Sequence, residues 1–213
     1  DGRVRWVLGS MGPGTKLPSL GHTTYDHLKQ TFAEQAEGLI DGGADAFLVE
    51  TSQDLLQTKA AVNGCKKAIA SRGIRLPIFV EVTVETTGTM LMGSEIGAAL
   101  TALEPLGVDA IGLNCATGPA EMSEHLRHLS KHSPVTVVCM PNAGLPVLTA
   151  DGSHYPLTPH ELASAHEQFV REFGIGLVGG CCGTTPEHLA AVVERLHGGG
   201  VPVVSRAIRD DLS

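Results

Sequence analysis

The sequence predicts an α/β fold with a parallel sheet, on two observations. Short apolar runs alternate with longer segments in which apolar residues recur every three or four positions, as in successive βα units. Glycines such as Gly42-Gly43 and Gly107 precede apolar runs, as they do where a helix ends before a strand. Six such units are fewer than the eight of a closed barrel, which typically needs about 250 residues. The pattern therefore leaves two alternatives, an open sheet or a barrel that lacks its first two βα units.

Six apolar runs are predicted to be strands: Arg5–Leu8, Ala46–Glu50, Ile78–Thr83, Ala110–Asn114, Thr136–Met140 and Ile175–Val178. The segments between them carry apolar stripes of helical spacing, which predict helices packed on the sheet. The clearest stripes are Leu28, Phe32, Ala36 and Leu39; Ile96, Leu100 and Leu103; Leu162, His166, Phe169, Val170 and Phe173; and Leu189, Val192, Val193 and Leu196.

Several predicted helices begin with recognisable capping residues. In Thr158-Pro159-His160-Glu161, a threonine precedes a first-turn proline and a glutamate that can bond back to it. Thr184 and Glu187 repeat this spacing, and Gly118-Pro119 opens a helix soon after Cys115.

The composition is that of a globular protein and argues against two classes of partner. Of the 213 residues, 42% are hydrophobic, which is enough for the core of a single domain. The sequence has no run of about 18 apolar residues, so no membrane span is predicted. A formal net charge of −8 argues against nucleic acid as a binding partner. The first residues do not resemble a signal peptide and the five cysteines do not resemble a disulfide framework, so the cytoplasm is the expected location.

Three cysteines follow predicted strands and are the main candidates for chemistry. Cys115 follows Gly112-Leu113-Asn114, and Cys181 and Cys182 follow Val178-Gly179-Gly180. Because the carboxyl ends of the strands meet at the mouth of a parallel barrel, the three thiols are expected to lie close together. Three thiolates make a metal site with one coordination position free, as a catalytic zinc needs. The alternative is three small buried residues at tight turns, and the residues alone leave both open.

The remaining cysteines and the histidines have simpler interpretations. Cys65, in the middle of a helix, and Cys139, within a strand, are expected to be core residues. His188 follows the paired cysteines by about one helical turn and is retained as a candidate ligand. Three histidines share a helix surface with basic residues and are expected to face solvent: His125, His128 and His132.

Two polar residues at strand ends are candidates for substrate binding. Glu50 ends the run Phe47-Leu48-Val49, where a carboxylate would face the mouth and bind an ammonium group. It could instead cap the next helix, a role for which Asp54 competes. Asn142, which follows another strand, either points at the same mouth or makes a turn.

Three motifs resemble those of the homocysteine S-methyltransferase family: Gly112-Leu113-Asn114-Cys115, Pro141-Asn142-Ala143-Gly144-Leu145-Pro146 and Gly179-Gly180-Cys181-Cys182-Gly183. Their order and spacing are those of the family, and the similarity covers about residues 4–197. Together with Val82–Gly93, the second motif is most similar to the homocysteine-binding domain of cobalamin-dependent methionine synthases.

The resemblance implies a (β/α)8 TIM-type barrel and a zinc ion held by Cys115, Cys181 and Cys182. It also implies that Glu50 binds the amino group of L-homocysteine, and we expect Asn142 to contact the substrate from the same mouth. The implied function is activation of homocysteine as a thiolate for S-methylation to methionine. The methyl donor would be methylcobalamin on another domain of the same enzyme, recharged from methyltetrahydrofolate on a third, folate-binding domain.

Alternative functions remain open from the sequence. One is a homocysteine methyltransferase that uses another methyl donor, such as S-methylmethionine or betaine. A second is a thiol redox domain in which Cys181 and Cys182 form a vicinal pair. A third is a closed structural zinc domain in which His188 supplies a fourth ligand.

One departure from the family concerns the start of the barrel. The family's barrel opens with a strand that ends in an Asp-Gly-rich loop, and Gly9-Ser10-Met11-Gly12-Pro13 resembles instead the loop after the family's third strand. The chain is therefore expected to lack the first two βα units. Residues 1–197 are predicted to form the partial barrel domain, and residues 198–213 a linker or tail toward a following domain.

Overall fold

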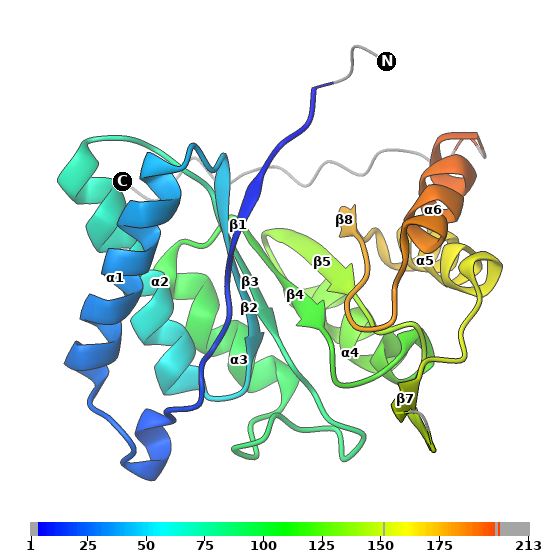
Figure 1. Cartoon of the computed structure of the whole chain (residues 1–213), viewed down its shortest axis with the longest axis horizontal. Helices are drawn as coiled ribbons and strands as arrows, with labels where there is room; N and C mark the ends of the chain where they lie inside the picture. The colour runs from blue at the N-terminus through cyan, green and yellow to red at the C-terminus, as the bar shows by residue number, and fades with distance from the viewer. Residues whose placement is uncertain (1–3, 151, 199, 201–213) are drawn as a thin grey trace.

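Six parallel strands form one curled sheet in the computed structural model, which describes residues 4–150, 152–198 and 200 (Figure 1). The strands pair in the order β1-β2-β3-β4-β5-β8, which is also their order along the chain, so β1 and β8 are the two edges. This is the arrangement of a half-barrel. The strands are β1 (Leu8–Met11), β2 (Ala46–Ser52), β3 (Ile78–Val82), β4 (Ala110–Asn114), β5 (Thr136–Met140) and β8 (Leu177–Val178).

Helices connect the strands and surround the sheet, from α1 and α2 on the left of Figure 1 to α5 and α6 on the right. Successive helices pack against one another along this row. Their bounds are α1 (Tyr25–Asp41), α2 (Leu55–Arg72), α3 (Ile96–Leu103), α4 (Pro119–His132), α5 (Pro159–Phe173) and α6 (Pro186–Gly198), with short 3-10 turns η1 (Pro18–Leu20) and η2 (Glu104–Leu106).

The main core lies between the sheet and these helices. Phe47, Ile111 and Leu126 are fully buried there, and Cys65 and Cys139 are buried core residues as predicted. The predicted apolar stripes supply much of the helical side of this core, which is why the strands stay covered by helices.

Helix starts follow the predicted capping residues in two of three places. Thr158 caps α5 with Glu161 as its reciprocal partner, and Gly118 donates its N–H to Glu121 at the start of α4. The cap predicted for Thr184 is wrong, because its hydroxyl donates to the carbonyl of Cys181 instead.

Two strand boundaries differ from the prediction at the edges of the sheet. The predicted strand Arg5–Leu8 is displaced, and β1 begins only at Leu8, paired with Ala46. Asp45 causes the displacement, because its side chain accepts the N–H of Val7 and its own N–H donates to the carbonyl of Val7. At the other edge, Ile175 follows directly after the left-handed Gly174 that ends α5, so β8 begins two residues later than predicted.

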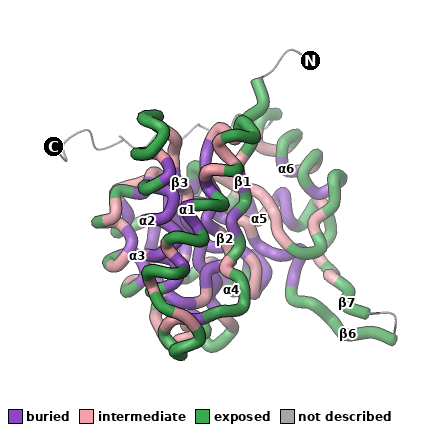
Figure 2. Tube along the Cα trace, turned by 60° about the vertical axis from the view of Figure 1, so that its left-hand side comes forward, coloured by how far each residue is buried: buried purple, intermediate pink, exposed green. Residues whose placement is uncertain are grey.

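A hairpin that the sequence did not predict lies between β5 and α5. It consists of β6 (Val147–Thr149) and β7 (Gly152–His154), which pair antiparallel. Figure 2 shows it projecting from the body with its strands exposed. The hairpin carries the chain out from the sheet and back to the start of α5.

The α/β class and the parallel sheet are confirmed, and the six strands account for a barrel without its first two units. No helix in the described part of the chain is long and apolar enough to span a bilayer. Most of the predicted linker, residues 199 and 201–213, lies outside the described residues.

Candidate metal centre

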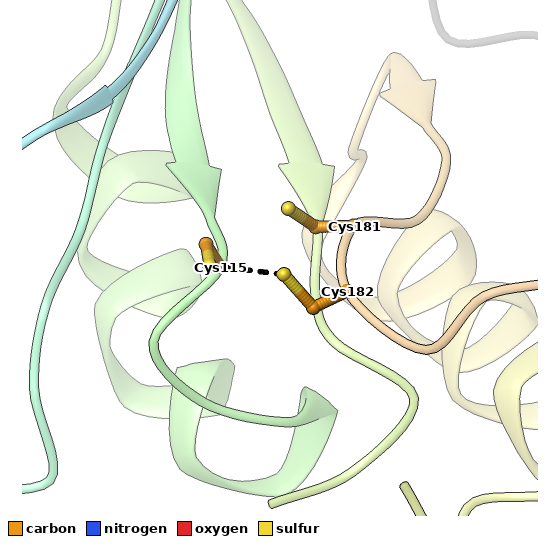
Figure 3. Close-up of side chains that lie close together, drawn as sticks. All are labelled: Cys115, Cys181 and Cys182. Carbon is orange, nitrogen blue, oxygen red and sulfur yellow. Dashed lines mark hydrogen bonds between the residues drawn. The ribbon is translucent and has the colours of Figure 1, made fainter. Parts of the chain in front are cut away.

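The three candidate cysteines come together at the carboxyl ends of the strands, as predicted. Cys115 follows β4 directly, and Cys181 and Cys182 lie in the turn between β8 and α6. Their sulfur atoms all lie within 4.8 Å of one another. Figure 3 shows the side chains of the paired cysteines directed toward Cys115, with the sulfurs of Cys115 and Cys182 3.7 Å apart.

The backbone at Cys115 is bent so that its side chain reaches the cluster. Cys115 has a φ of 57° and Ala116 also has 57°, a left-handed conformation that is uncommon for residues other than glycine. The N–H of Cys115 still donates to the carbonyl of Met140, at 3.2 Å. The bend therefore comes immediately after the last bond of the β4–β5 ladder.

The turn that carries the paired cysteines is held by the loop after β5. Cys181 donates its N–H to the carbonyl of Pro141 at 2.8 Å, and Cys182 donates to Oδ1 of Asn142 at 3.1 Å. Ala143 in turn donates to the carbonyl of Cys182 at 2.9 Å. Three bonds between two short segments fix the direction of both cysteine side chains.

The contacts within the cluster favour the thiolate of Cys115 over that of Cys181. The pKa of Cys115 is lowered, chiefly by a hydrogen bond from Cys181, with further bonds from the N–H of Ala116, Cys182 and Asn142 outweighing partial burial. The pKa of Cys181 is raised, chiefly because its thiol donates that bond, and then by burial and by the negative charges of its two partners. A divalent cation would supply the charge needed to ionise all three thiols.

Glu50 lies beside the cluster and does not cap α2. Asp54 takes the capping position and accepts from Leu56, which settles the competition that the sequence left open. Glu50 accepts hydrogen bonds from the hydroxyl of Ser10 and, at 3.3 Å, from Nδ2 of Asn114. Its partly exposed carboxylate is therefore held at the mouth.

Asn114 connects this carboxylate to the thiols, a role that the sequence analysis did not identify. Its Nδ2 lies 3.8 Å from the sulfur of Cys181, and its Oδ1 accepts the N–H of Thr51 at 2.8 Å. Asn114 is also buried at the end of β4. The sequence did contain a signal, since Asn114 is a polar residue directly before the candidate ligand Cys115. We interpreted it only as part of the motif that ends at Cys115 and assigned it no contact of its own.

Asn142 lies beside the cysteine cluster and also makes a turn, in which its carbonyl accepts the N–H of Gly144 at 2.7 Å. Its Oδ1 holds the N–H of Cys182 and its side chain also bonds to Cys115, so both contacts lie within the cysteine cluster. The side chain is buried. A contact between Asn142 and a substrate therefore stays a prediction.

His188 is not part of the cluster. Its Nδ1 bonds to Thr185 and its Nε2 to the carbonyl of Leu157 at 2.8 Å, so both ring nitrogens are engaged elsewhere. Among the described histidine, cysteine, aspartate and glutamate residues, the one group able to hold a metal ion is Cys115, Cys181 and Cys182. Of the three helix histidines expected to face solvent, His132 is exposed and His125 and His128 are half-buried.

The sequence of the chain matches the model of one family, homocysteine S-methyltransferase, over residues 1–196. The chain belongs to the homocysteine S-methyltransferase family. This confirms the resemblance that the three motifs indicated, and it places the cysteine cluster within the matched region.

Two methionine synthases are similar to this family member over most of its length. The protein of Mycobacterium leprae (strain TN) is 67% identical over 201 residues, which are 93% of the chain and 17% of that protein. The protein of Mycobacterium tuberculosis (strain ATCC 25618 / H37Rv) is 68% identical over 190 residues, 89% of the chain and 16% of that protein. The chain thus spans about a sixth of the length of these relatives.

Solved structures of a homocysteine methyltransferase share the fold of this family member. The apo form of MmuM from Escherichia coli superposes with a TM-score of 0.68 at 24% identity, covering 89% of the chain and 62% of MmuM. Its metallated form gives a TM-score of 0.63 at 23% identity, covering 87% and 59%. At these identities the likeness supports the fold.

Proposed function

We propose that the chain binds one zinc ion through Cys115, Cys181 and Cys182 and activates homocysteine as a thiolate for S-methylation to methionine. The observation that carries the proposal is the convergence of three thiols with no fourth ligand among the described residues. Such a set leaves one coordination position for an incoming sulfur, as in catalytic zinc sites.

The spacing of the thiols fits zinc. A tetrahedral zinc with Zn–S bonds of about 2.3 Å sets its sulfur ligands about 3.8 Å apart. The sulfurs of Cys115 and Cys182 are 3.7 Å apart, and all three lie within 4.8 Å. Sulfur ligands favour zinc over magnesium or calcium, which prefer oxygen.

The chemistry required is ionisation of a thiol near neutral pH. A free thiol has a pKa of about 8.5, so only about 3% of it is ionised at pH 7. Bound zinc would supply positive charge that favours the ionised substrate sulfur, while three thiolate ligands keep that sulfur electron-rich and nucleophilic. The residues of the chain then have to hold the rest of the amino acid.

We assign the substrate ammonium group to Glu50. Homocysteine joins its sulfur to its ammonium group through a short carbon chain, so an anion beside the thiol cluster suits it. Nδ2 of Asn114 lies 3.3 Å from the Glu50 carboxylate and 3.8 Å from the sulfur of Cys181. The carboxylate is therefore close enough to the thiols for one homocysteine molecule to reach both. Ser10 and Asn114 hold the carboxylate in place, so that an ammonium group meets an already oriented charge.

The methyl donor is proposed from the relatives. Both similar proteins are named methionine synthase and are far longer than this chain. We propose methylcobalamin as the donor, carried by another domain of such an enzyme and recharged from methyltetrahydrofolate on a third. Residues 198–213 would then lead toward a following domain.

Metal analysis combined with calorimetry tests the proposal. The purified protein is expected to contain one zinc per chain and to release a proton when L-homocysteine is added at constant pH. Methionine, which carries no thiol proton, is the matched control and should release none. Absence of zinc, or zinc without proton release, would contradict the proposal; a disulfide within the cluster in metal-free protein would favour the redox alternative.

A further inference from the structure

A histidine of α5, His166, reaches from the helix to the backbone just before the paired cysteines. Its side chain is fully buried, and its Nε2 lies 2.7 Å from the carbonyl oxygen of Gly179. The ring of Phe169 lies edge-on to it, with the ring centroids 6.5 Å apart. The other ring nitrogen, Nδ1, has no hydrogen-bond partner among the described residues. Within that part of the chain, the bond to Gly179 is thus the only hydrogen bond of this ring.

The direction of this hydrogen bond follows from its acceptor. A carbonyl oxygen can only accept, so Nε2 carries the proton and donates it. Burial lowers the pKa of His166 to about 4 and outweighs the bond to Gly179, which acts in the opposite direction. The ring is therefore neutral at pH 7, with a donor at Nε2 and an unprotonated Nδ1. His166 thus serves as a fixed donor to the backbone.

The acceptor lies at the point where β8 leads into the cysteine turn. Gly179 donates its N–H to the carbonyl of Cys139 on β5 at 3.0 Å. Gly179 and Gly180 have no side chains, so no side-chain packing directs the chain between β8 and Cys181. A side chain would not fit beside the turn either, because a Cβ atom on Gly180 would lie 2.2 Å from Cγ2 of Thr184. The course of this segment therefore depends on its backbone hydrogen bonds.

Two hydrogen bonds orient successive peptide groups of this glycine pair. The carbonyl of Gly179 belongs to the planar peptide group between the two glycines, and His166 holds it from α5. The N–H of Cys181 belongs to the next peptide group, and it donates to the carbonyl of Pro141 at 2.8 Å. The chain that leads to the paired cysteines is thus held from a helix on one side and from the loop after β5 on the other.

We propose that His166 is a positioning residue of the metal centre, which holds the peptide group between Gly179 and Gly180 and thereby directs the paired cysteines toward Cys115. This inference rests on the proposed metal site. Without the bond, the glycine pair can adopt other backbone angles, so metal binding would have to order the turn as well as gather three thiols. Contacts that orient metal ligands typically change metal affinity by 10- to 100-fold.

Two amide substitutions separate the hydrogen bond from the bulk of the ring. Glutamine carries its amide nitrogen about as far from the backbone as Nε2, and asparagine about as far as Nδ1, so only His166→Gln can keep the bond. The affinity for cobalt(II), measured by chelator competition, should fall about 10-fold in His166→Asn and stay unchanged in His166→Gln. Val170→Ala removes buried packing from the same helix and should bind cobalt normally, which makes it the control for lost stability.

Two measurements on the metal-free protein test the geometry directly. Amide hydrogen exchange at Cys181, whose N–H donates to Pro141, should be faster in His166→Asn than in the original protein or in His166→Gln. Nitrogen-15 NMR of the original protein should show the His166 ring neutral and protonated at Nε2. A doubly protonated ring at pH 7, or a ring protonated at Nδ1, would refute the bond, and this measurement needs no variant to fold.

The outcomes separate this inference from the proposed function. If the original protein binds no cobalt, the metal site is refuted and this inference with it. If it binds cobalt and His166→Asn binds as tightly, only the role of His166 is refuted. Equal losses of affinity in both amide variants would also overturn the proposal, because the bulk of the ring rather than its bond would then matter. An equal loss in Val170→Ala would assign the effect to general stability.

Discussion

Backbone strain is concentrated beside the cysteine cluster. Among the described residues, the non-glycine residues with positive φ are Thr51, Cys115 and Ala116, at 57–58°. A left-handed conformation costs about 1–2 kcal/mol in a residue with a side chain. Asn114 bonds to both the N–H and the hydroxyl of Thr51, which offsets part of this strain. The ends of β2 and β4 are thereby locked together where Glu50 and the thiols must meet.

Replacing one cluster cysteine should abolish metal binding. Cys115→Ser or Cys182→Ser leaves only two thiols. The serine hydroxyl is a harder ligand than a thiolate and does not ionise readily, so the zinc content per chain should fall from one to near zero. Cys65→Ala is the matched control, because burial raises the pKa of the Cys65 thiol to about 12 and the residue packs beside Met11. Metal analysis after gel filtration measures the effect. Full zinc content in both serine variants would refute the ligand assignment.

Removing the charge of Glu50 should weaken substrate binding. Glu50→Gln keeps the contacts with Ser10 and Asn114 approximately but loses the charge-assisted bond to an ammonium group, worth about 1.5–3 kcal/mol. The KM for homocysteine should rise roughly 10- to 100-fold, with a smaller change in kcat. Steady-state kinetics with methylcobalamin supplied in solution measures both, with Glu194→Gln at an exposed position of α6 as the control. An unchanged KM would remove Glu50 from the substrate site.

At the scale of elements, the site is built by loops that follow different strands. The loop after β5 holds the cysteine turn after β8 through backbone bonds at Pro141 and Ala143. Helix α6 begins directly after that turn, and His188 joins its first turn to Leu157. The direction of the paired thiols thus depends on a helix start and on a neighbouring loop.

Loss of His188 should reduce stability without loss of metal. His188→Ala removes the bonds to Thr185 and to the carbonyl of Leu157, so the free energy of unfolding should fall by about 1–3 kcal/mol. Zinc per chain should stay at one. Chemical denaturation and metal analysis test the two statements, and His197→Ala at the exposed end of α6 is the control. Zinc loss with unchanged stability would restore His188 as a ligand.

The sequence predicted the elements better than their connections. Apolar runs gave β4 and β5 with their observed bounds, because both strands are buried and their hydrophobic patterns are continuous. The two edge strands begin later than predicted. Asp45 bonds to Val7 just before β1, and Gly174 ends α5 just before β8; the local apolar pattern reports neither contact. The three cysteines were predictable from their place after strands. The bonds that Asn114 makes to Glu50 and Thr51 were not, because they join segments far apart in the chain.

At the scale of the whole molecule, the half-barrel buries the carboxyl group of Glu81. Glu81 on β3 is fully buried, and neither carboxyl oxygen has a hydrogen-bond partner among the described residues. Its pKa is raised well above the usual value by burial and, secondarily, by the charge of Glu50. The pKa of Cys139 is also raised, first by burial and then by the charge of Glu81.

This carboxyl group should make stability depend on pH. Below the unfolded pKa of about 4.3, Glu81 is protonated in both states and its contribution to stability is fully present. As pH rises, only the unfolded state ionises, so stability is lost progressively up to the raised folded pKa. Glu81→Gln should therefore match the original protein near pH 4 and exceed it by roughly 1–3 kcal/mol at pH 8.

Urea denaturation at several pH values measures this difference, with Glu194→Gln as the control. A stability difference between Glu81→Gln and the original protein that is constant from pH 4 to pH 8 would contradict the buried, protonated state of Glu81.

X-ray absorption at the zinc edge tests the central claim most directly, because it counts the sulfur neighbours of the metal. The free protein should show three sulfur neighbours at about 2.3 Å and one lighter atom. Addition of L-homocysteine should convert this to four sulfurs. Four protein ligands without change on addition of homocysteine, or fewer than three sulfurs in the free protein, would contradict an open three-cysteine centre.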